Sequence, residues 1–156
     1  MSILAQLREF LEGHHVHYEV TAHRQAFTAQ EVAESEHIPG MIVAKVVMLR
    51  DGPDFFMAVL PAPYHVDLDG ARQMLGRPGL DLAKEEQFAG LFPGCEPGAM
   101  PPLGNLWKVP VWVDTALTHD KEIVFNAGTH TETVRMRYSD FAHLVQPKVA
   151  PLAAED

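Results

Sequence analysis

The chain has 156 residues, of which 47% are hydrophobic and 21% are charged, a composition typical of one globular domain and unlike that of a disordered chain. Lysine and arginine total 12 against 21 acidic residues, giving a net charge of −9, which argues against a protein that grips a whole nucleic acid through its phosphates. The single cysteine, Cys95, excludes an internal disulfide, and no apolar run reaches the roughly 18 residues of a membrane span, so we expect a cytoplasmic protein.

The first third of the chain alternates between helical and extended patterns. Apolar residues at helical spacing predict a helix that Ser2 caps and Gly13 ends. Period-two alternation over 15–20 predicts a half-buried strand. Residues 28–31 match a capping box and predict a short helix up to about residue 37.

The most apolar stretch of the chain, 42–49, predicts a central strand that is covered on both faces of its sheet. A short turn separates it from a second apolar run, 55–60, so the two runs are expected to form a hairpin. Asp67 or Asp69, and then Asp81, are expected to open two further short helices.

Residues 92–110 are rich in proline and glycine, which predicts an ordered loop with a function. A last helix is expected to start at Ser139, and the tail 148–156 is expected to be frayed. Short strands are predicted between these segments, at 111–113, 123–125 and 133–138. The interleaved elements predict a single domain over 1–156, of mixed α/β class with a mixed sheet.

Lys45 is the residue most informative about function. It lies among seven apolar residues of the predicted central strand, and that run contains no acidic residue. A charged amine would be costly to bury there without a partner. It is therefore expected to open into a cleft, pair with a distant acid or meet an anionic ligand. The alternative is a strand-end lysine whose ammonium group reaches solvent.

Two further segments could carry chemistry. Glycines in 94–102 would let a ligand approach the backbone closely, and the prolines would stiffen the path. The strand that ends in Gly128-Thr129-His130 places a titratable side chain at a turn. An ordinary surface loop and a solvated histidine explain the same patterns without a site.

Familiar catalytic motifs are largely missing, since the chain has no G-x-S-x-G, P-loop, G-x-G-x-x-G or H-E-x-x-H pattern. A thiol hydrolase with Cys95 as nucleophile and His130 as its base is one alternative. His14, His15 and His17 lie on the expected solvent side of one strand, so a metal site is not expected.

An ordered set of segments resembles the YbaK/ProX family, which includes free-standing editing proteins and the editing domain of bacterial prolyl-tRNA synthetases. The resemblance covers roughly residues 20–147. Its segments are 28–34, 38–40, 43–47, 94–102 and 122–128.

This resemblance implies a mixed, partly barrel-like sheet flanked by helices, with no metal or organic cofactor. It implies hydrolysis of the ester that joins a small amino acid to the terminal adenosine of a mischarged tRNA, often tRNA-Pro carrying alanine or cysteine. The partner is then the acceptor 3′ end of that tRNA, and an aminoacyl-tRNA synthetase is a further candidate. The alternative is a non-catalytic module that binds an aminoacyl end, a free amino acid or a synthetase.

The resemblance also implies a set of site residues. Lys45 would be the catalytic lysine, in contact with the phosphate of the terminal nucleotide or with the ester oxygens. Residues of the proline-rich loop and of the following turn would hold the amino acid and polarise its carbonyl. These substrate-binding residues are Gly98, Ala99, Met100, Pro101, Gly128, Thr129 and His130.

A basic face is a separate expectation from the residues themselves. Arg135 and Arg137, together with Lys108 and Lys121, are expected to contact tRNA phosphates. A solvated strand face explains the same charges equally well.

Overall fold

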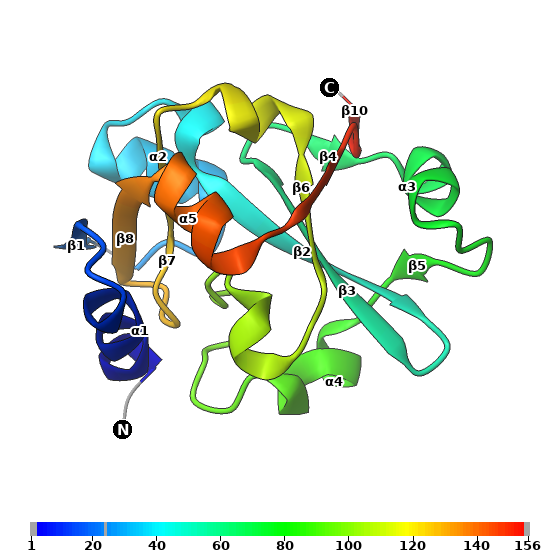
Figure 1. Ribbon diagram of the computed structural model, residues 1–156, viewed down its shortest axis with the longest axis horizontal. Coiled ribbons are helices and arrows are strands. Elements are labelled where there is room, and N and C mark those ends of the chain that lie inside the picture. Colours follow the sequence, from blue (N-terminus) through cyan, green and yellow to red (C-terminus); the bar gives the residue numbers. More distant parts are fainter. Residues whose placement is uncertain (1–2, 24, 155–156) are drawn as a thin grey trace.

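The computed structural model of the protein describes residues 3–23 and 25–154 (Figure 1). The predicted cap Ser2 lies outside the described residues. The helices are α1 Ile3–Gly13, α2 Ala29–Glu36, α3 Leu68–Leu75, α4 Glu85–Phe88 and α5 Tyr138–Val145. The strands are β1 Tyr18–Ala22, β2 Ala44–Asp51, β3 Asp54–Pro61, β4 His65–Val66, β5 Asp81–Leu82, β6 Val111–Asp114, β7 Glu122–Asn126, β8 Glu132–Arg137, β9 Lys148–Ala150 and β10 Ala153–Ala154. None of the described helices is both long and apolar enough to cross a membrane.

The strands form three sheets, which confirms the predicted mixed α/β class. A five-stranded sheet has the order β5-β2-β3-β6-β9, a three-stranded sheet the order β1-β8-β7, and β10 pairs with β4. The larger sheet is mixed, because β2 and β3 are antiparallel whereas β6 is parallel to both β3 and β9. A parallel bridge between Val43 and Val124 joins the two larger sheets beside the start of β2.

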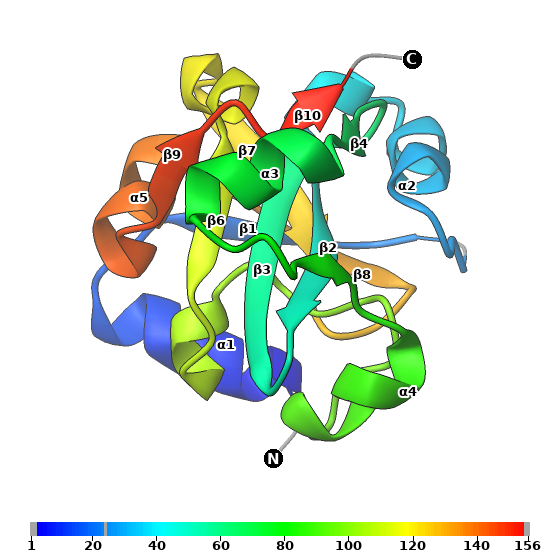
Figure 2. The same cartoon turned by 90° about the vertical axis from the view of Figure 1, so that its right-hand side faces the viewer.

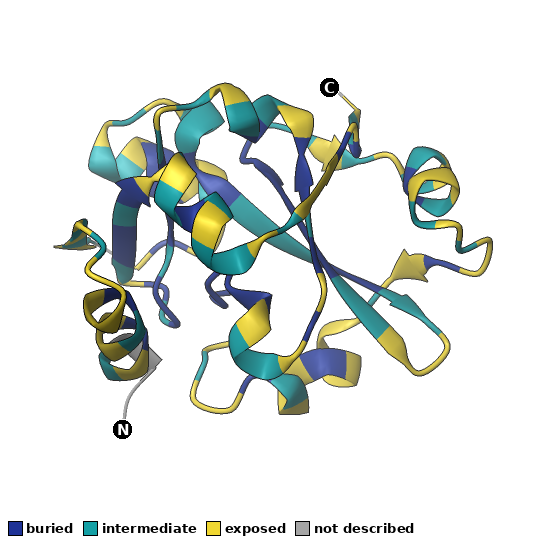
Figure 3. Ribbon diagram, viewed as in Figure 1, coloured by how far each residue is buried: buried dark blue, intermediate teal, exposed yellow. Residues whose placement is uncertain are grey.

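The hairpin of β2 and β3 is the centre of the fold, as the sequence predicts. Apolar clusters cover both faces of its sheet, which explains why both alternating positions of β2 are hydrophobic. Met48 faces the cluster that contains α1, α5 and the three-stranded sheet, and Leu49 faces the cluster beneath α3. Figure 2 shows α3 lying across the outer face of β3, and Figure 3 shows the buried residues following the central strands.

Two predicted helix caps are confirmed. The hydroxyl of Thr28 accepts a hydrogen bond from the backbone N–H of Glu31 at 3.1 Å and starts α2. Asp67 accepts from the backbone N–H of Gly70 at 3.2 Å and starts α3.

Three local predictions are wrong. The first strand begins only at Tyr18, because the chain is still turning at His15, whose φ is +58°. Asp81 does not open a helix but starts β5, where it pairs with Arg50 of β2. The last helix begins at Tyr138, one residue before the predicted cap, Ser139.

The prediction of a frayed C-terminal tail is also wrong over the described part of that tail, residues 148–154. Strand β9 pairs with β6, β10 pairs with β4, and Leu152 between them is fully buried. The carboxylate of Asp114, itself 4% exposed, accepts hydrogen bonds from the backbone N–H groups of Leu152 and Ala153 at 2.8 and 3.0 Å. The segment is therefore held by partners distant in sequence, which its own residue pattern does not reveal.

Candidate functional site

A cavity of about 490 Å³ opens beside the start of β2. Its walls come from the start of α2, the ends of β3 and β7, strand β4 and the proline-rich loop. The volume lies within the range of small-molecule sites, roughly 300–1,000 Å³. Segments that are distant in the sequence, between Phe27 and Asn126, thus meet around one cavity.

Lys45 lies on the wall of this cavity. It is half-buried on β2, and its Nζ donates a hydrogen bond to the backbone carbonyl of Ala62 at 3.0 Å. No aspartate or glutamate is among the described residues of the cavity wall. The cavity therefore presents a cation to a bound ligand and suits an anionic or electron-rich group.

The proline-rich loop forms the opposite wall through Gly98 and Met100. Gly98 has a φ of +80°, which lies in the left-handed region that favours glycine. Ala99 and Pro101 are buried and are not on the wall. Met100 is also buried and belongs to the main apolar cluster, so this part of the loop joins the cavity wall to the core.

Two backbone hydrogen bonds fix the loop to the turn that follows β7. The N–H of Glu96 donates to the carbonyl of Gly128 at 2.8 Å, and the N–H of Gly128 donates to the carbonyl of Ala99 at 2.9 Å. Gly128 therefore holds the proline-rich loop in place through its backbone. The hydroxyl of Thr129 faces away toward Glu132, at 3.3 Å.

His130 is buried behind the same loop and does not line the cavity. Its Nε2 lies 2.7 Å from the carbonyl oxygen of Pro97, so Nε2 carries the proton and donates it. Its backbone N–H donates to the carboxylate of Glu96 at 3.2 Å. The ring also contacts Phe27, 5.0 Å away between centroids, and Phe27 does line the cavity. The position of His130 is that of a support for the loop.

Several cavity residues were not identified from the sequence, among them Phe27, His65 and Asn126. Phe27 stands at the rim with 62% of its surface exposed. His65 comes from β4, which pairs with β10, so no local pattern marks it. Asn126 ends β7, and its side-chain oxygen is buried without a hydrogen-bond partner among the described residues. For Asn126, the only sequence feature that could have indicated a place in the site is its position at the end of a predicted strand, just before the glycine turn.

Comparison with known families identifies the family of this chain. A family model described as aminoacyl-tRNA editing domain matches residues 23–144. The chain belongs to this family. The predicted resemblance to YbaK/ProX proteins is therefore confirmed over most of the editing domain.

Solved structures share the fold of this editing domain at low sequence identity. A candidate trans-editing enzyme for prolyl tRNA synthetase matches with a TM-score of 0.83 and 21% identity, covering 99% of this chain and 98% of that one. The hypothetical protein APE2540 matches with a TM-score of 0.86 and 16% identity, covering 96% and 99%. A scaffold protein used for computational epitope grafting matches with a TM-score of 0.85 and 21% identity, covering 100% and 99%. A comparison with curated proteins gives no match.

Cys95 does not lie on the wall of the editing-domain cavity. Burial raises the pKa of its thiol to about 11. Because the thiolate is the nucleophilic form, a thiol with this pKa is almost entirely unreactive near neutral pH. The structure therefore disfavours the thiol-hydrolase alternative.

We expect iodoacetamide to alkylate Cys95 slowly in the native protein near neutral pH. The native rate should rise as the pH approaches about 11, because the raised pKa delays formation of the thiolate. Mass spectrometry of quenched samples would follow the reaction, with urea-unfolded protein as the control. Equal rates for native and unfolded protein at neutral pH would contradict this expectation.

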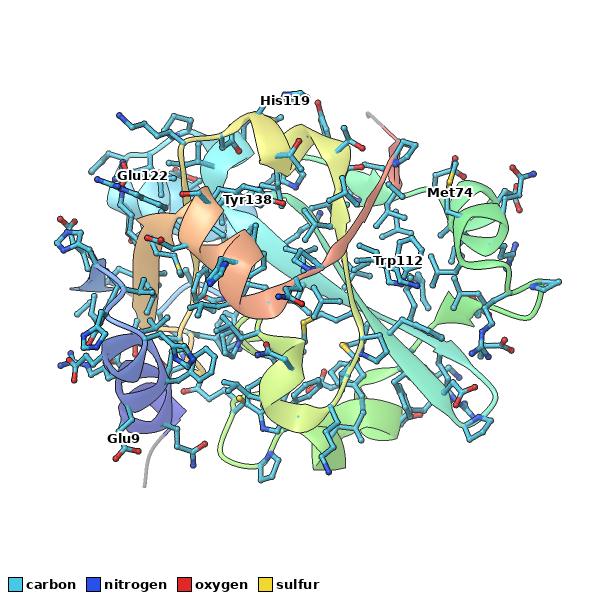
Figure 4. The ribbon with its side chains drawn as sticks, viewed as in Figure 1. Glu9, Met74, Trp112, His119, Glu122 and Tyr138 are labelled. Carbon is cyan, nitrogen blue, oxygen red and sulfur yellow. The ribbon has the colours of Figure 1, made fainter. Side chains whose placement is uncertain are left out.

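The four cations expected to contact phosphates do not share one surface. Arg135 forms an ion pair with Glu122 at 3.2 Å, and both line a hollow together with Lys121 and Arg137. Lys108 lies instead in a separate groove beside Trp112. Figure 4 labels Glu122 and Trp112 on opposite sides of α5. The expected basic face is thus divided.

Arg135 also borders an acidic hollow of about 820 Å³ between α2 and β1. The described wall of this hollow includes four glutamates: Glu19, Glu31, Glu34 and Glu36. Glu36 accepts a hydrogen bond from the hydroxyl of Thr133 at 2.6 Å. Carboxylates near Arg135 on both sides make this surface a poor place for phosphate.

Proposed function

We propose that the chain is a trans-acting aminoacyl-tRNA deacylase in which residues 1–156 act as a single editing domain. Its substrate is a tRNA mischarged with a small amino acid, and tRNA-Pro carrying alanine or cysteine is the first candidate. The observation that carries the proposal is the cavity whose wall Lys45 shares with Gly98 and Met100 of the proline-rich loop.

The chemistry requires little machinery, because an aminoacyl ester is already activated. Water adds to the carbonyl carbon, the ester C–O bond breaks, and the free amino acid and the ribose hydroxyl leave. The site has to position the water or a neighbouring ribose hydroxyl and to stabilise the developing oxyanion. A cation and fixed backbone groups supply that stabilisation without a catalytic triad.

Each wall of the cavity has a part in this proposal. Lys45 stabilises the negative charge that develops on the ester. Asn126 offers a side-chain amide whose oxygen has no hydrogen-bond partner among the described residues. His65 supplies an imidazole, the side chain used most often in proton transfer. Phe27 at the rim offers a flat apolar surface on which the terminal adenine stacks.

The cavity also gives a reason for selection by size. A synthetase discriminates poorly against a smaller side chain, because one methylene is worth only about 1–3 kcal/mol. A second, narrow site removes the small amino acids that the first site accepts. Met100 and Val46, both on the cavity wall, are the apolar side chains placed to limit the size of the bound amino acid.

A panel of tRNAs carrying alanine, cysteine, serine and proline tests this function. We expect the purified protein to release at least one small amino acid more than about a hundredfold faster than spontaneous hydrolysis. Release of labelled amino acid over time is the measurement, with protein-free reactions as the control. The net charge of −9 favours the non-catalytic alternative, and binding of aminoacyl-tRNA without any hydrolysis would establish that alternative.

A further inference from the structure

A second groove lies away from the cavity, between the end of α3 and strands β6 and β9. Its volume is about 500 Å³, and its wall contains the cations Arg77, Lys108 and Lys148. The described residues of the wall include no carboxylate, although the chain as a whole carries a net charge of −9. Positive charge is therefore concentrated in this groove, although the protein as a whole is acidic.

The three cations differ in how far their charge is already neutralised. Arg77 forms ion pairs with Asp51 at 3.3 Å and with Asp54 at 2.8 Å, so little of its charge is available. Lys108 and Lys148 are exposed, and neither forms an ion pair with any residue in the described part of the chain. The groove thus presents two available ammonium groups.

An aromatic ring lies beside one of these charges. The ammonium group of Lys148 lies 5.3 Å from the centroid of the Trp112 ring, a cation–π contact. Lys108 adopts a φ of +60°, in the left-handed region that favours glycine, yet the position carries a long basic side chain. Cations combined with an aromatic face and no acid are the chemistry that binds the backbone and bases of nucleic acids.

Lys45 of the cavity lies on the same face of the five-stranded sheet as Trp112 and Lys148 of the groove. The pairings of Lys45 with Leu60, Ala58 with Trp112, and Trp112 with Lys148 place these side chains on one side. Helix α3 lies across that face (Figure 2), with His65 of the cavity before its first residue and Arg77 of the groove after its last.

The length of helix α3 gives an estimate of the distance between the cavity and the groove. Its 8 residues span on the order of 12 Å. At roughly 3.4 Å per nucleotide, about four nucleotides cover that distance. This is the length of a short single-stranded end, not of a whole tRNA.

We propose that this groove binds the sugar-phosphate backbone of tRNA where the single-stranded 3′ end joins the acceptor stem. Lys108 and Lys148 contact phosphates, and Trp112 packs against a sugar or base. The inference rests on the proposed function, since it takes the RNA whose acylated end enters the cavity as the occupant. With this groove as the contact, a protein with a net negative charge would bind RNA through one local group of positive charges.

Charge reversal at both lysines tests the groove. We expect the double variant Lys108→Glu and Lys148→Glu to raise the Kd for uncharged tRNA by about tenfold or more at moderate salt. The slope of log Kd against log salt should fall by about 1.4, that is about 0.7 for each lost phosphate contact. Fluorescence anisotropy of labelled tRNA over a salt series gives both quantities.

The control variant is Arg8→Glu with Lys84→Glu, which changes the net charge equally at two residues outside the groove. An equal loss of affinity in this control would show an effect of overall charge and would overturn the proposal. An unchanged Kd and slope in the groove variant would also overturn it, as would a loss of synthetase binding with tRNA binding intact.

The function and the groove can fail separately. Hydrolysis of a minimal aminoacyl ester of adenosine, which lacks the acceptor stem, should be equal in the wild type and the groove variant. If the wild type hydrolyses no ester but the variant still loses affinity for tRNA, the groove proposal survives and the proposed function fails. If the wild type is active and the variant keeps its KM for mischarged tRNA, the groove proposal fails alone.

Discussion

Replacement of Lys45 by alanine is expected to lower kcat/KM for deacylation by at least about a hundredfold, since removing one donor to a developing oxyanion costs roughly 10²–10³. The fold should persist, because Lys45 is only half-buried and stands on the wall of an open cavity. The loss should therefore appear in catalysis and not in thermal stability. Initial rates with the most active mischarged tRNA, together with a melting curve, provide the measurement.

Two further substitutions separate charge from packing at this position. Lys45→Met keeps most of the aliphatic stem without the ammonium group and should be as inactive as Lys45→Ala. Lys45→Arg keeps the charge but places it in a wider planar group, so partial activity is expected. Wild-type activity in Lys45→Met would remove the lysine from the mechanism.

Substitution of Asp114 by alanine is expected to cost about 3 kcal/mol of the free energy of unfolding. The buried carboxylate accepts backbone hydrogen bonds from Ala116 at 3.0 Å, as well as from Leu152 and Ala153. Hydrogen bonds to a charged group contribute about 1.5–3 kcal/mol each, and alanine would leave three donors without their acceptor. For a chain of this length the melting temperature should fall by about 6–12 °C.

Asp114→Asn is the matched control for this prediction. Its side chain retains one acceptor oxygen at nearly the same volume, so the loss of stability should be smaller than with alanine. Calorimetry measures both variants. An unchanged melting temperature in Asp114→Ala would show that the C-terminal strands do not depend on this carboxylate.

The parts of the fold with local signals could be predicted from the sequence. Thr28 and Asp67 cap their helices through side-chain oxygens that reach only three residues along the chain. The β2–β3 hairpin follows from two apolar runs that a tight turn connects. The position of Lys45 on the wall of a cavity agrees with the cost of burying a charge among apolar neighbours, although that argument alone does not locate the cavity.

The remaining features depend on contacts between distant segments. The C-terminal strands form because Asp114 and β4 accept them, and nothing within residues 148–154 shows this. His65 reaches the cavity through the same pairing. Lys108 was grouped with Arg135 on the basis of charge, but the direction of each side chain depends on strand order, which composition does not contain.

The two backbone hydrogen bonds that join Glu96 and Ala99 to Gly128, with His130 bonded to Pro97 behind them, have a consequence for selectivity. These three hydrogen bonds hold the loop in place. The loop cannot move outward to make room for a larger ligand without breaking hydrogen bonds to the turn that follows β7. In a deacylase such a rigid wall would limit the size of the bound amino acid. A larger amino acid would then be excluded by steric clash with the wall and not by the lack of a favourable contact. The correctly charged tRNA would then be spared because its amino acid does not fit.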